Sequence, residues 1–412
     1  MVTAKAVILC CGASGRLGLP ASGYLYGTYE NPSNAGDGYA MAYHAGADLT
    51  GIECFQINPL IKDYNGPACA YVTGPLGGHT VNALGHRFIE SDYWSGQMML
   101  EFYRELQSEN GPVYLKLTHL APETISEIER VLHHTERPSR GRFHLGRGND
   151  YRDDLIEMHI SEIGLCSGHS ASGVYVNEHG ETSVPGLYAA GDMAAVPHNY
   201  LLGALTYGKI CATSALAFIA RTAEPRLDEA AVALESQRIL APLSRPTGVP
   251  HHQYEYKVRR LVNDYLQPPK SGHRMQRGLA AFMRAKDEYE ELGAQNPHEL
   301  MRVHEGSFIR DCAEFAARAS LFRTESRWGL YHHRVDYPEL DDEHWFVHVN
   351  IRKAEDGSMQ LYKRPVEPYS IPLDRTERRG YHALRLGDAN AAARDARDAR
   401  DAIDAGVPEA RA

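Results

Sequence analysis

The stretch KAVILCCGASGRLG, residues 5–18, decides the fold class of this chain. An apolar run at residues 6–10 leads directly into a turn with glycines at positions 12, 15 and 18. A strand, a glycine-rich turn and a helix in this order hold a dinucleotide in many proteins with alternating strands and helices. We therefore predict an α/β chain, and the question is whether this turn grips a nucleotide diphosphate.

The spacing of these glycines differs from that of the usual diphosphate-binding turn. That turn needs G-x-G-x-x-G, whose second glycine lets the backbone approach the diphosphate, and an acidic residue about twenty positions later that binds the ribose. Here Ser14 occupies the middle glycine position, and Glu30 stands in a loop-like stretch. Taken alone, residues 5–18 fit an ordinary strand-to-helix turn equally well. A hydrolase built on Ser14 is a minor alternative, because GASGR lacks the G-x-S-x-G spacing.

Composition restricts the function class. With 412 residues the chain has room for more than one domain, and its 43% hydrophobic and 23% charged residues are ordinary for a globular protein. A net charge of −10 argues against general nucleic-acid binding. No apolar run reaches about eighteen residues and no leader pattern is seen, so we predict no membrane span and no signal peptide.

The cysteines and histidines argue against a metal site. None of the seven cysteines forms a CxxC pair, which excludes the usual spacings of zinc ribbons and iron–sulfur clusters. Their odd number suits a reducing compartment, so we predict a cytoplasmic location. Three His-His doublets begin at residues 133, 251 and 332, but adjacent side chains diverge and lack partners at ligand spacing. We therefore predict no bound metal.

Periodicity gives a coarse order of elements. Residues 38–47 predict a short helix, 111–117 a strand and 122–133 an acidic helix. Residues 173–190 predict a hairpin, followed by an apolar helix from Gly203 to about Ala220. Residues 228–322 are helical throughout, with apolar stripes such as Val258/Val262 and Cys312/Phe315. Strands and loops return at 323–375, and a charged three-residue repeat at 393–405 predicts a solvated tail.

Two Gly-Asp pairs change the interpretation of the opening turn. Gly36-Asp37 stands in NAGDGYAMAYHAGADL (34–49), and Gly191-Asp192 ends TSVPGLYAAGD within residues 182–192. A carboxylate after a short strand can accept hydrogen bonds from the ribityl hydroxyls of a flavin. The N-terminus of a following helix can face the electron-rich end of the flavin ring. The second pair leads to LLGALTYGKI (201–210), where Gly203 opens that helix.

In order, the segments CCGA, AGDG, VPGLYAAGD and LLGALTYG resemble a set found in the flavoprotein subunits of the fumarate reductase and succinate dehydrogenase superfamily. There they read ATGG, TGDG and VPGLYAAGE, followed by a glycine-opened helix. GIECFQINP (51–59) resembles the strand that enters the capping domain of that family, and GGHTVNALGHRF (77–88) resembles its Gly-Gly strand and turn. This resemblance covers residues 4–220.

Within the superfamily the chain most resembles the alpha subunit of adenylylsulfate (APS) reductase. The segments that carry this resemblance are IKDYNGPACAY (61–71), SGHSASGVYV (167–176), PHNYLLGALTYGKI (197–210) and RTESRWGLYHHRVDYPELDDEHW (323–345). They extend the similarity to about residue 370.

The resemblance implies a partial FAD-binding, Rossmann-like α/β domain with an inserted α+β capping domain, a helical domain and a C-terminal strand and loop region. The corresponding ranges are 1–50 and 166–220 for the FAD-binding parts, 51–165 for the capping domain, 221–330 for the helical domain, 331–375 for the C-terminal region and 376–412 for the charged tail. It implies FAD as the cofactor, held by Gly12, Ala13, Gly36, Asp37, Gly191, Asp192, Gly203, Ala204 and Leu205.

Several family side chains that bind anions are replaced here. The arginine that protonates the alkene in fumarate reductases corresponds to Gly74, and the substrate-binding histidine before a proline corresponds to Asn58. HNYLLG contains no second arginine, and the arginine of the APS-reductase group corresponds to Leu60. A dicarboxylate would be poorly compensated without these groups, so fumarate chemistry is disfavoured, and APS reduction is in doubt as well.

The remaining candidates for chemistry are mostly histidines and cations. His169 matches a histidine near the flavin in both groups, and we predict that it transfers a proton or orients the substrate. A backbone-bonded histidine at a strand entry is the alternative for His169. Lys62 could add positive charge to the pocket, although a solvated lysine fits this position as well. Weaker substrate-binding candidates are Asn58, His79, Arg87 and His198.

The resemblance places the ADP-binding turn of the family before residue 1. We expect either that a separate N-terminal flavoprotein half supplies it, that the gene starts earlier, or that the chain is a remnant. The expected function is two-electron transfer between FAD and a small, anionic or sulfur-containing substrate, with a ferredoxin-like iron–sulfur subunit as electron partner. The alternative is a non-catalytic assembly or binding subunit.

Overall fold

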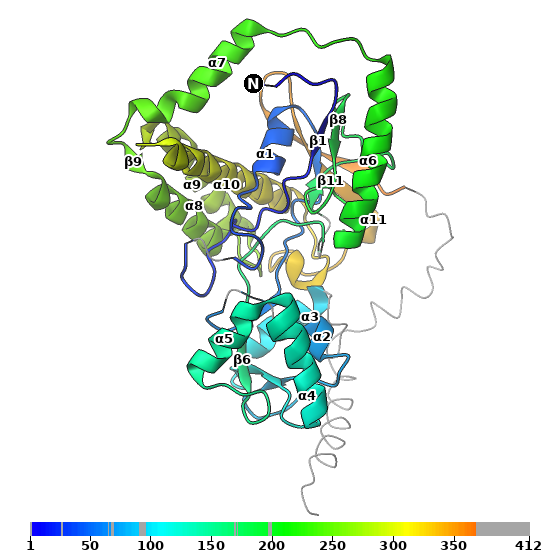
Figure 1. Cartoon of the computed structure of the whole chain (residues 1–412), viewed down its shortest axis with the longest axis vertical. Helices are drawn as coiled ribbons and strands as arrows, with labels where there is room; N and C mark the ends of the chain where they lie inside the picture. The colour runs from blue at the N-terminus through cyan, green and yellow to red at the C-terminus, as the bar shows by residue number, and fades with distance from the viewer. Residues whose placement is uncertain are drawn as a thin grey trace, which may run out of the picture. The chain divides into compact units, whose positions relative to one another are not determined.

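The computed structural model describes residues 2–25, 28–64, 66, 70–89, 96–168, 170, 172–196 and 200–367. The chain divides into two compact units. Unit 1 is built from Met1–Asn58 and Ser161–Pro365, and unit 2 from Pro59–Ile160 (Figure 1). Each unit is described by itself below.

Unit 1 contains a two-stranded parallel sheet that carries the opening turn. Strand β1 (Val7–Leu9) pairs with β8 (Leu187–Ala189), and Val7 lies opposite Leu187. The apolar run predicted at residues 6–10 is therefore a strand, although a short one. Two parallel strands rarely form a complete sheet, because parallel sheets are usually larger and covered on both faces.

A second sheet of unit 1 is antiparallel and has the order β12-β11-β2-β7. Its strands are β2 (Leu49–Thr50), β7 (Gly173–Val174), β11 (Val347–Lys353) and β12 (Met359–Pro365). The predicted hairpin at 173–190 is wrong, because β7 pairs with β2 whereas β8 pairs with β1. Only the turn at 177–181 is confirmed, where the backbone N–H of Gly180 donates to the carbonyl of Asn177 and that of Asn177 donates to the carbonyl of Glu181.

Helices make up most of the remainder of unit 1. The prediction of helices in 228–322 is confirmed, but short connections separate them at residues 245–250, 266–271 and 292–296, and these include two strands of two residues each, β9 (Val249–Pro250) and β10 (Leu292–Gly293). The helices are α1 (Asp37–His44), α6 (Leu201–Arg221), α7 (Glu229–Leu240), α8 (His251–Tyr265), α9 (Gly272–Glu288), α10 (Pro297–Phe322) and α11 (Asp342–Trp345), with 3-10 turns at Ala241–Ser244, Tyr289–Glu291 and Gly329–Tyr331.

Helices α8, α9 and α10 pack on one another through the predicted apolar stripes. Val258 and Val262 of α8 are fully buried, as is Cys312 of α10. A buried ionic network ties the opening turn to these helices. The Arg16 guanidinium contacts Glu255 of α8 at 2.5 Å and Glu305 of α10 at 2.6 Å. Because a buried charge is costly unless it is paired, this network fixes the position of the turn against the helices.

Helix α6 is unusually apolar for a helix that is mostly exposed. It is long and apolar enough to cross a membrane by length and composition alone, with a mean hydropathy of 1.4 over its most apolar window. We predicted no membrane-spanning helix because the sequence has no continuous apolar run of about eighteen residues. That criterion does not exclude a helix such as α6, in which polar residues interrupt an apolar sequence. Only Cys211 and Ala215 of its 21 residues are buried.

Unit 2 is an antiparallel sheet covered by helices. Its strand order is β3-β6-β5-β4, with β3 (Pro59–Ile61), β4 (His79–Asn82), β5 (Val113–Lys116) and β6 (Ile156–Ile160). The helices are α2 (Ala70–Thr73), α3 (Gly96–Leu106), α4 (Pro122–Glu129) and α5 (Pro138–Arg147), with a π-helix at Arg130–Glu136. The helix predicted at 122–133 thus starts as expected and changes its winding after Glu129.

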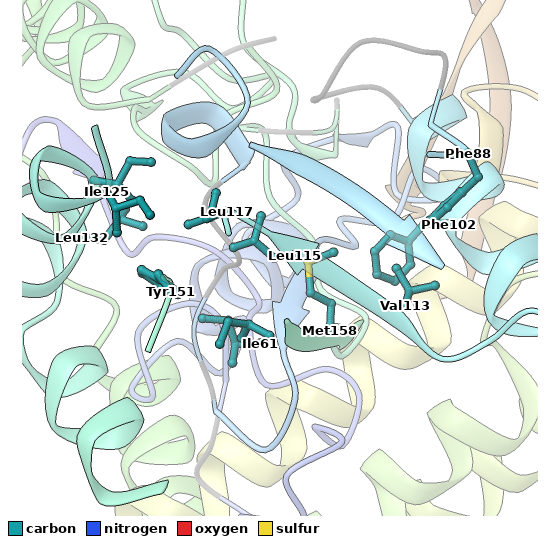
Figure 2. Close-up of a cluster of buried hydrophobic side chains, with 12 residues drawn as sticks. Ile61, Phe88, Phe102, Val113, Leu115, Leu117, Ile125, Leu132, Tyr151 and Met158 are labelled. Carbon is teal, nitrogen blue, oxygen red and sulfur yellow. The ribbon is translucent and has the colours of Figure 1, made fainter. Parts of the chain in front are cut away.

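The core of unit 2 lies between this sheet and its helices. Leu115 and Met158 come from the sheet, Phe102 comes from α3 and Ile125 from α4 (Figure 2). All four side chains are buried, so the unit has a hydrophobic core of its own.

Candidate functional site

Three glycine turns that lie far apart in the sequence meet in unit 1. The backbone N–H of Cys11 donates to the thioether sulfur of Met193 at 3.3 Å. The hydroxyl of Tyr39, in the first turn of α1, donates to the backbone carbonyl of Ser172 at 3.2 Å and lies 3.3 Å from that of Asp192. The CCGA turn, the Gly36-Asp37 pair and the Gly191-Asp192 pair are thereby held together, as the motifs predicted.

Each of these turns depends on a glycine with positive φ. The φ angles are +77° at Gly12, +80° at Gly36 and +76° at Gly191, a conformation that side chains disfavour. At Gly36 a Cβ would also lie 2.5 Å from the Cys312 sulfur. Any other residue at these three positions would strain the backbone of its turn.

The first turn of α6 lies against the second Gly-Asp pair. A Cβ placed on Gly191 would stand 3.8 Å from the Cβ of Ala204. Gly203 and Ala204 are half-buried, whereas Leu205 is exposed. The structure therefore brings Ala204 to the second Gly-Asp pair, and the role of Leu205 stays a prediction. Ala13, which follows Gly12, is buried.

The two carboxylates at the turns are half-buried and differ in their partners. Burial raises the pKa of Asp37, while the backbone N–H groups of Asp37 and Gly38 lower it in part. Burial alone raises the pKa of Asp192. Within the described part of the chain, no group donates a hydrogen bond to the Asp192 carboxylate. A half-buried carboxylate with free acceptor positions fits a ligand that carries hydroxyl donors, such as the ribityl chain of a flavin.

A large cavity begins at two of the three turns. It has a volume of about 1260 Å³, and Cys11, Asn34 and Asp37 contribute to its wall. Helices α7, α9 and α10 supply most of the remaining wall, which is rich in charged side chains. Asp192 does not line this cavity, so the flavin assignment depends on the convergence of the turns and not on the cavity.

The predicted substrate residues fall in both units. Asn58 belongs to unit 1 and is only 2% exposed. Its backbone N–H donates to Ser161 Oγ at 2.8 Å, but its side-chain Nδ2 has no hydrogen-bond partner among the residues that the structure describes. A buried amide donor without a partner is costly, so a ligand oxygen that accepts from it would be stabilised. The sequence singled out Asn58 but gave no sign that its amide is unsatisfied.

Three other candidates belong to unit 2. Lys62 is exposed and paired with Glu157, with 2.7 Å between Nζ and Oε1. His79 of β4 stacks on His119, with ring centroids 4.2 Å apart. Arg87 lies opposite Val81 across a local bridge. His169 and His198 lie outside the described residues.

Sequence reasoning missed Met193 and Tyr39, which join the turns. Their contacts link segments more than a hundred residues apart, and their spacing carries no signal. In the described ranges, no group of three or more His, Cys, Asp or Glu side chains is arranged to hold a metal ion.

Comparisons with known proteins agree with this arrangement. A family model described as "FAD binding domain" matches residues 1–204, and one described as "Fumarate reductase flavoprotein C-term" matches residues 255–383. The chain is 27% identical to the fumarate reductase flavoprotein subunit of Mycobacterium tuberculosis, over 89% of this chain and 66% of that protein. It is 25% identical to the L-aspartate oxidase of Streptomyces coelicolor, over 88% of this chain and 62% of the oxidase.

The fold is also shared with a solved structure. Adenylylsulfate reductase from Archaeoglobus fulgidus superimposes with a TM-score of 0.79 at 26% identity, over 88% of this chain and 67% of that one. The chain thus spans about two thirds of the length of these relatives. The predicted fold class and cofactor are confirmed: this chain belongs to the FAD-binding flavoprotein family of fumarate reductase and adenylylsulfate reductase.

Proposed function

We propose that this chain is the flavin-contacting part of an FAD-dependent oxidoreductase that acts on a small, anionic or sulfur-containing substrate. The observation that carries the proposal is the half-buried Asp192 carboxylate, to which no group in the described part of the chain donates a hydrogen bond, in the region where three glycine turns and the first turn of α6 meet. When bound, FAD supplies a carrier for two electrons.

The residues at the turns would hold and orient the cofactor. Asp192 and Asp37 would accept hydrogen bonds from hydroxyl groups of the cofactor. The N-terminus of α6, a helix of 21 residues, supplies backbone N–H groups and a positive dipole end, which favour negative charge at the flavin ring. Gly12, Ala13 and Gly36 would contribute backbone groups to the cofactor site, and their small size lets the turns pack against neighbouring residues of the protein.

The substrate is proposed from the side chains of this chain and not from the names of its relatives. Fumarate reductases, aspartate oxidases and adenylylsulfate reductases act on different molecules. This chain has Gly74 and Leu60 where the resemblance expects arginines. The unsatisfied amide of Asn58 offers one neutral donor to a substrate oxygen, which suits a small anion better than a dicarboxylate.

Further parts of the proposal come from the resemblance. His169 is proposed as the group that gives or takes the proton, and His198, Lys62, His79 and Arg87 as weaker substrate contacts. Unit 2 is proposed as the capping domain. An iron–sulfur subunit and a part that carries the ADP-binding turn are the proposed partners. A non-catalytic binding subunit is the second candidate.

Flavin retention tests the proposal and separates the two candidates. The chain is purified together with the proteins that associate with it in its host, and bound FAD is measured by absorbance. We expect a yellow, FAD-loaded preparation. Asp192→Ala should weaken FAD binding by about tenfold to a hundredfold, the loss typical of a hydrogen bond to a charged group.

The matched control is Asp356→Ala, which removes an exposed carboxylate from the turn between β11 and β12. Its carboxylate accepts hydrogen bonds from Ser358 within the same turn. A colourless wild-type preparation would contradict the proposal and favour the non-catalytic subunit. Equal FAD affinity in the Asp192 and Asp356 variants would show that the site is misplaced.

A further inference from the structure

Two neighbouring segments of unit 1 carry buried polar atoms to which no described residue is hydrogen-bonded. Gln56 lies opposite Gly164 in an antiparallel bridge, and the backbone N–H of Ser161 donates to the carbonyl of Asn58 at 2.8 Å. Two residue steps lead from Gln56 to Asn58, whereas three lead from Gly164 to Ser161, so the second segment holds one extra residue. Such a β-bulge redirects side chains and is frequent next to active sites.

The bulge carries Glu162, a buried carboxyl group. Its exposed fraction is 6%, and that of Asn58 on the other segment is 2%. Glu162 Oε1 accepts a hydrogen bond from the backbone N–H of Tyr29, whereas Glu162 Oε2 has no partner in the described part of the chain. No cation of the described residues forms an ion pair with Glu162. Burial raises the pKa of Glu162, because a buried carboxylate without a paired cation is costly, and this favours the neutral acid.

The loop that carries Tyr29 lies against the same face of both segments. Its next residue, Glu30, accepts a hydrogen bond from Gln56 Nε2 at 2.6 Å. Alternate side chains of an extended segment point to one face, so Asn58 shares the face of Gln56. The Asn58 amide and the Glu162 carboxyl group therefore lie on the same side of this pair of segments, the side that the loop covers.

The nearest polar and charged neighbours of Glu162 have other partners. Thr28 lies beside Glu162, but its hydroxyl donates its one proton to the carbonyl of Gly15 at 2.9 Å. Arg259 of α8 acts on Glu162 from a distance, and its guanidinium donates to the carbonyl of Gly18 at 2.6 Å. The Oε2 atom of Glu162 is thus available to a group from outside the described residues.

We propose that the Nδ2–H of Asn58 and the Oε2–H of a neutral Glu162 form a two-donor subsite for one oxyanion group of the substrate, such as a carboxylate or a sulfur oxyanion. The inference rests on the proposed function, because it adds Glu162 to the residues that bind the small anion proposed there. Two neutral donors stabilise an anion without a paired cation, and burial strengthens both hydrogen bonds. An ionised Glu162 would instead repel an anion and attract an ammonium group.

Saturation-transfer NMR on the full chain tests the subsite, with acetate as the oxyanion probe and methylammonium as a cation of similar size. We expect acetate to bind and methylammonium not to bind. Glu162→Gln keeps a neutral donor and should retain the acetate affinity within about threefold, whereas Glu162→Ala should lower it about tenfold or more. The matched control Glu178→Gln changes an exposed carboxylate of the same unit and should leave the affinity unchanged.

Asn58→Asp tests the other donor with a side chain of the same size. It replaces the amide donor by a carboxylate and should abolish acetate binding, while circular dichroism checks that the variant is folded. The proposal would be overturned by methylammonium binding to the wild type, by loss of acetate binding in Glu162→Gln, by acetate binding that Glu162→Ala and Asn58→Asp retain, or by no binding of either probe. Binding is read without flavin, so a preparation that lacks FAD bears on the proposed function alone, and the acetate titration still decides the subsite.

Discussion

At the scale of single residues, three glycines define the site. Gly12, Gly36 and Gly191 all have positive φ, but their surroundings differ. A Cβ on Gly36 would contact Cys312 and Ser14, whereas a Cβ on Gly191 would meet only Ala204 at 3.8 Å. Gly36 is therefore constrained by both its backbone and its packing, and it joins the opening turn to α10.

Gly36→Ala should destabilise the protein more than a substitution that changes only the backbone. Gly357, in the turn between β11 and β12, has nearly the same φ of +81° but nothing within 4 Å of an added Cβ. We expect Gly357→Ala to cost about 1 kcal/mol of unfolding free energy from backbone strain, and Gly36→Ala to cost about 1–3 kcal/mol more. Urea unfolding of both variants measures the difference, and equal losses would contradict the packing described for Gly36.

Some features of the site could be predicted from the sequence, and others could not. The turn at Gly12 could be predicted from a glycine after an apolar run, and the turns at Gly36 and Gly191 from a glycine next to a carboxylate, because these are local patterns. The roles of Met193 and Tyr39 could not, since they depend on contacts between distant segments. The unsatisfied amide of Asn58 could not be predicted either, because it is a property of the folded surroundings.

At the scale of elements, helices were predicted better than strands. The apolar stripes of α8 and α10 repeat along one face and indicate both the helix and its buried side. Apart from the hairpin of β11 and β12, the strands of unit 1 have only two or three residues of their own or pair with strands far away in the sequence, as β7 does with β2. The turn at 177–181 was recognisable, but the pairing of its flanking strands was not.

The helices of unit 2 contain a buried histidine, His144, and a half-buried one, His133, that link its stability to pH. His133 of the π-helix and His144 of α5 stack with ring centroids 5.5 Å apart, and His144 also lies 3.3 Å from the Tyr151 hydroxyl. Burial lowers the pKa of His144 to about 4 from its ordinary value of 6.5, and it lowers the pKa of His133 as well. Both side chains are therefore neutral in the folded protein near pH 7.

Because the unfolded chain binds these protons more readily, the folded state should lose stability as the pH falls from about 6.5 towards 4. Above pH 6.5 the contribution of His144 is complete. His144→Gln should reduce this acid sensitivity, whereas the exposed control His134→Gln should not. Urea midpoints measured at pH 7.5 and pH 5 compare the two variants with the wild type. A His144→Gln protein with unchanged acid sensitivity would contradict this account.

At the scale of the whole molecule, the chain brings together turns that lie far apart in its sequence. The opening turn does not have the diphosphate-binding spacing, yet it joins two Gly-Asp turns that suit the flavin end. The family and the fold class could be predicted from the ordered set of four motifs, even though each motif is weak by itself. The substrate could not be predicted. Gly74, Asn58 and Leu60 stand where the family has groups that bind anions, and the sequence does not indicate which other groups bind the substrate.

The most direct test of this account is a titration of the purified chain with riboflavin, FAD and ADP, followed by flavin fluorescence. If the three turns hold the ribityl and ring end of the cofactor, riboflavin and FAD should bind weakly and with affinities within about threefold of each other, and ADP should not compete. Tight, stoichiometric FAD binding that ADP displaces, with riboflavin bound far more weakly, would contradict the claim that these turns grip the flavin end.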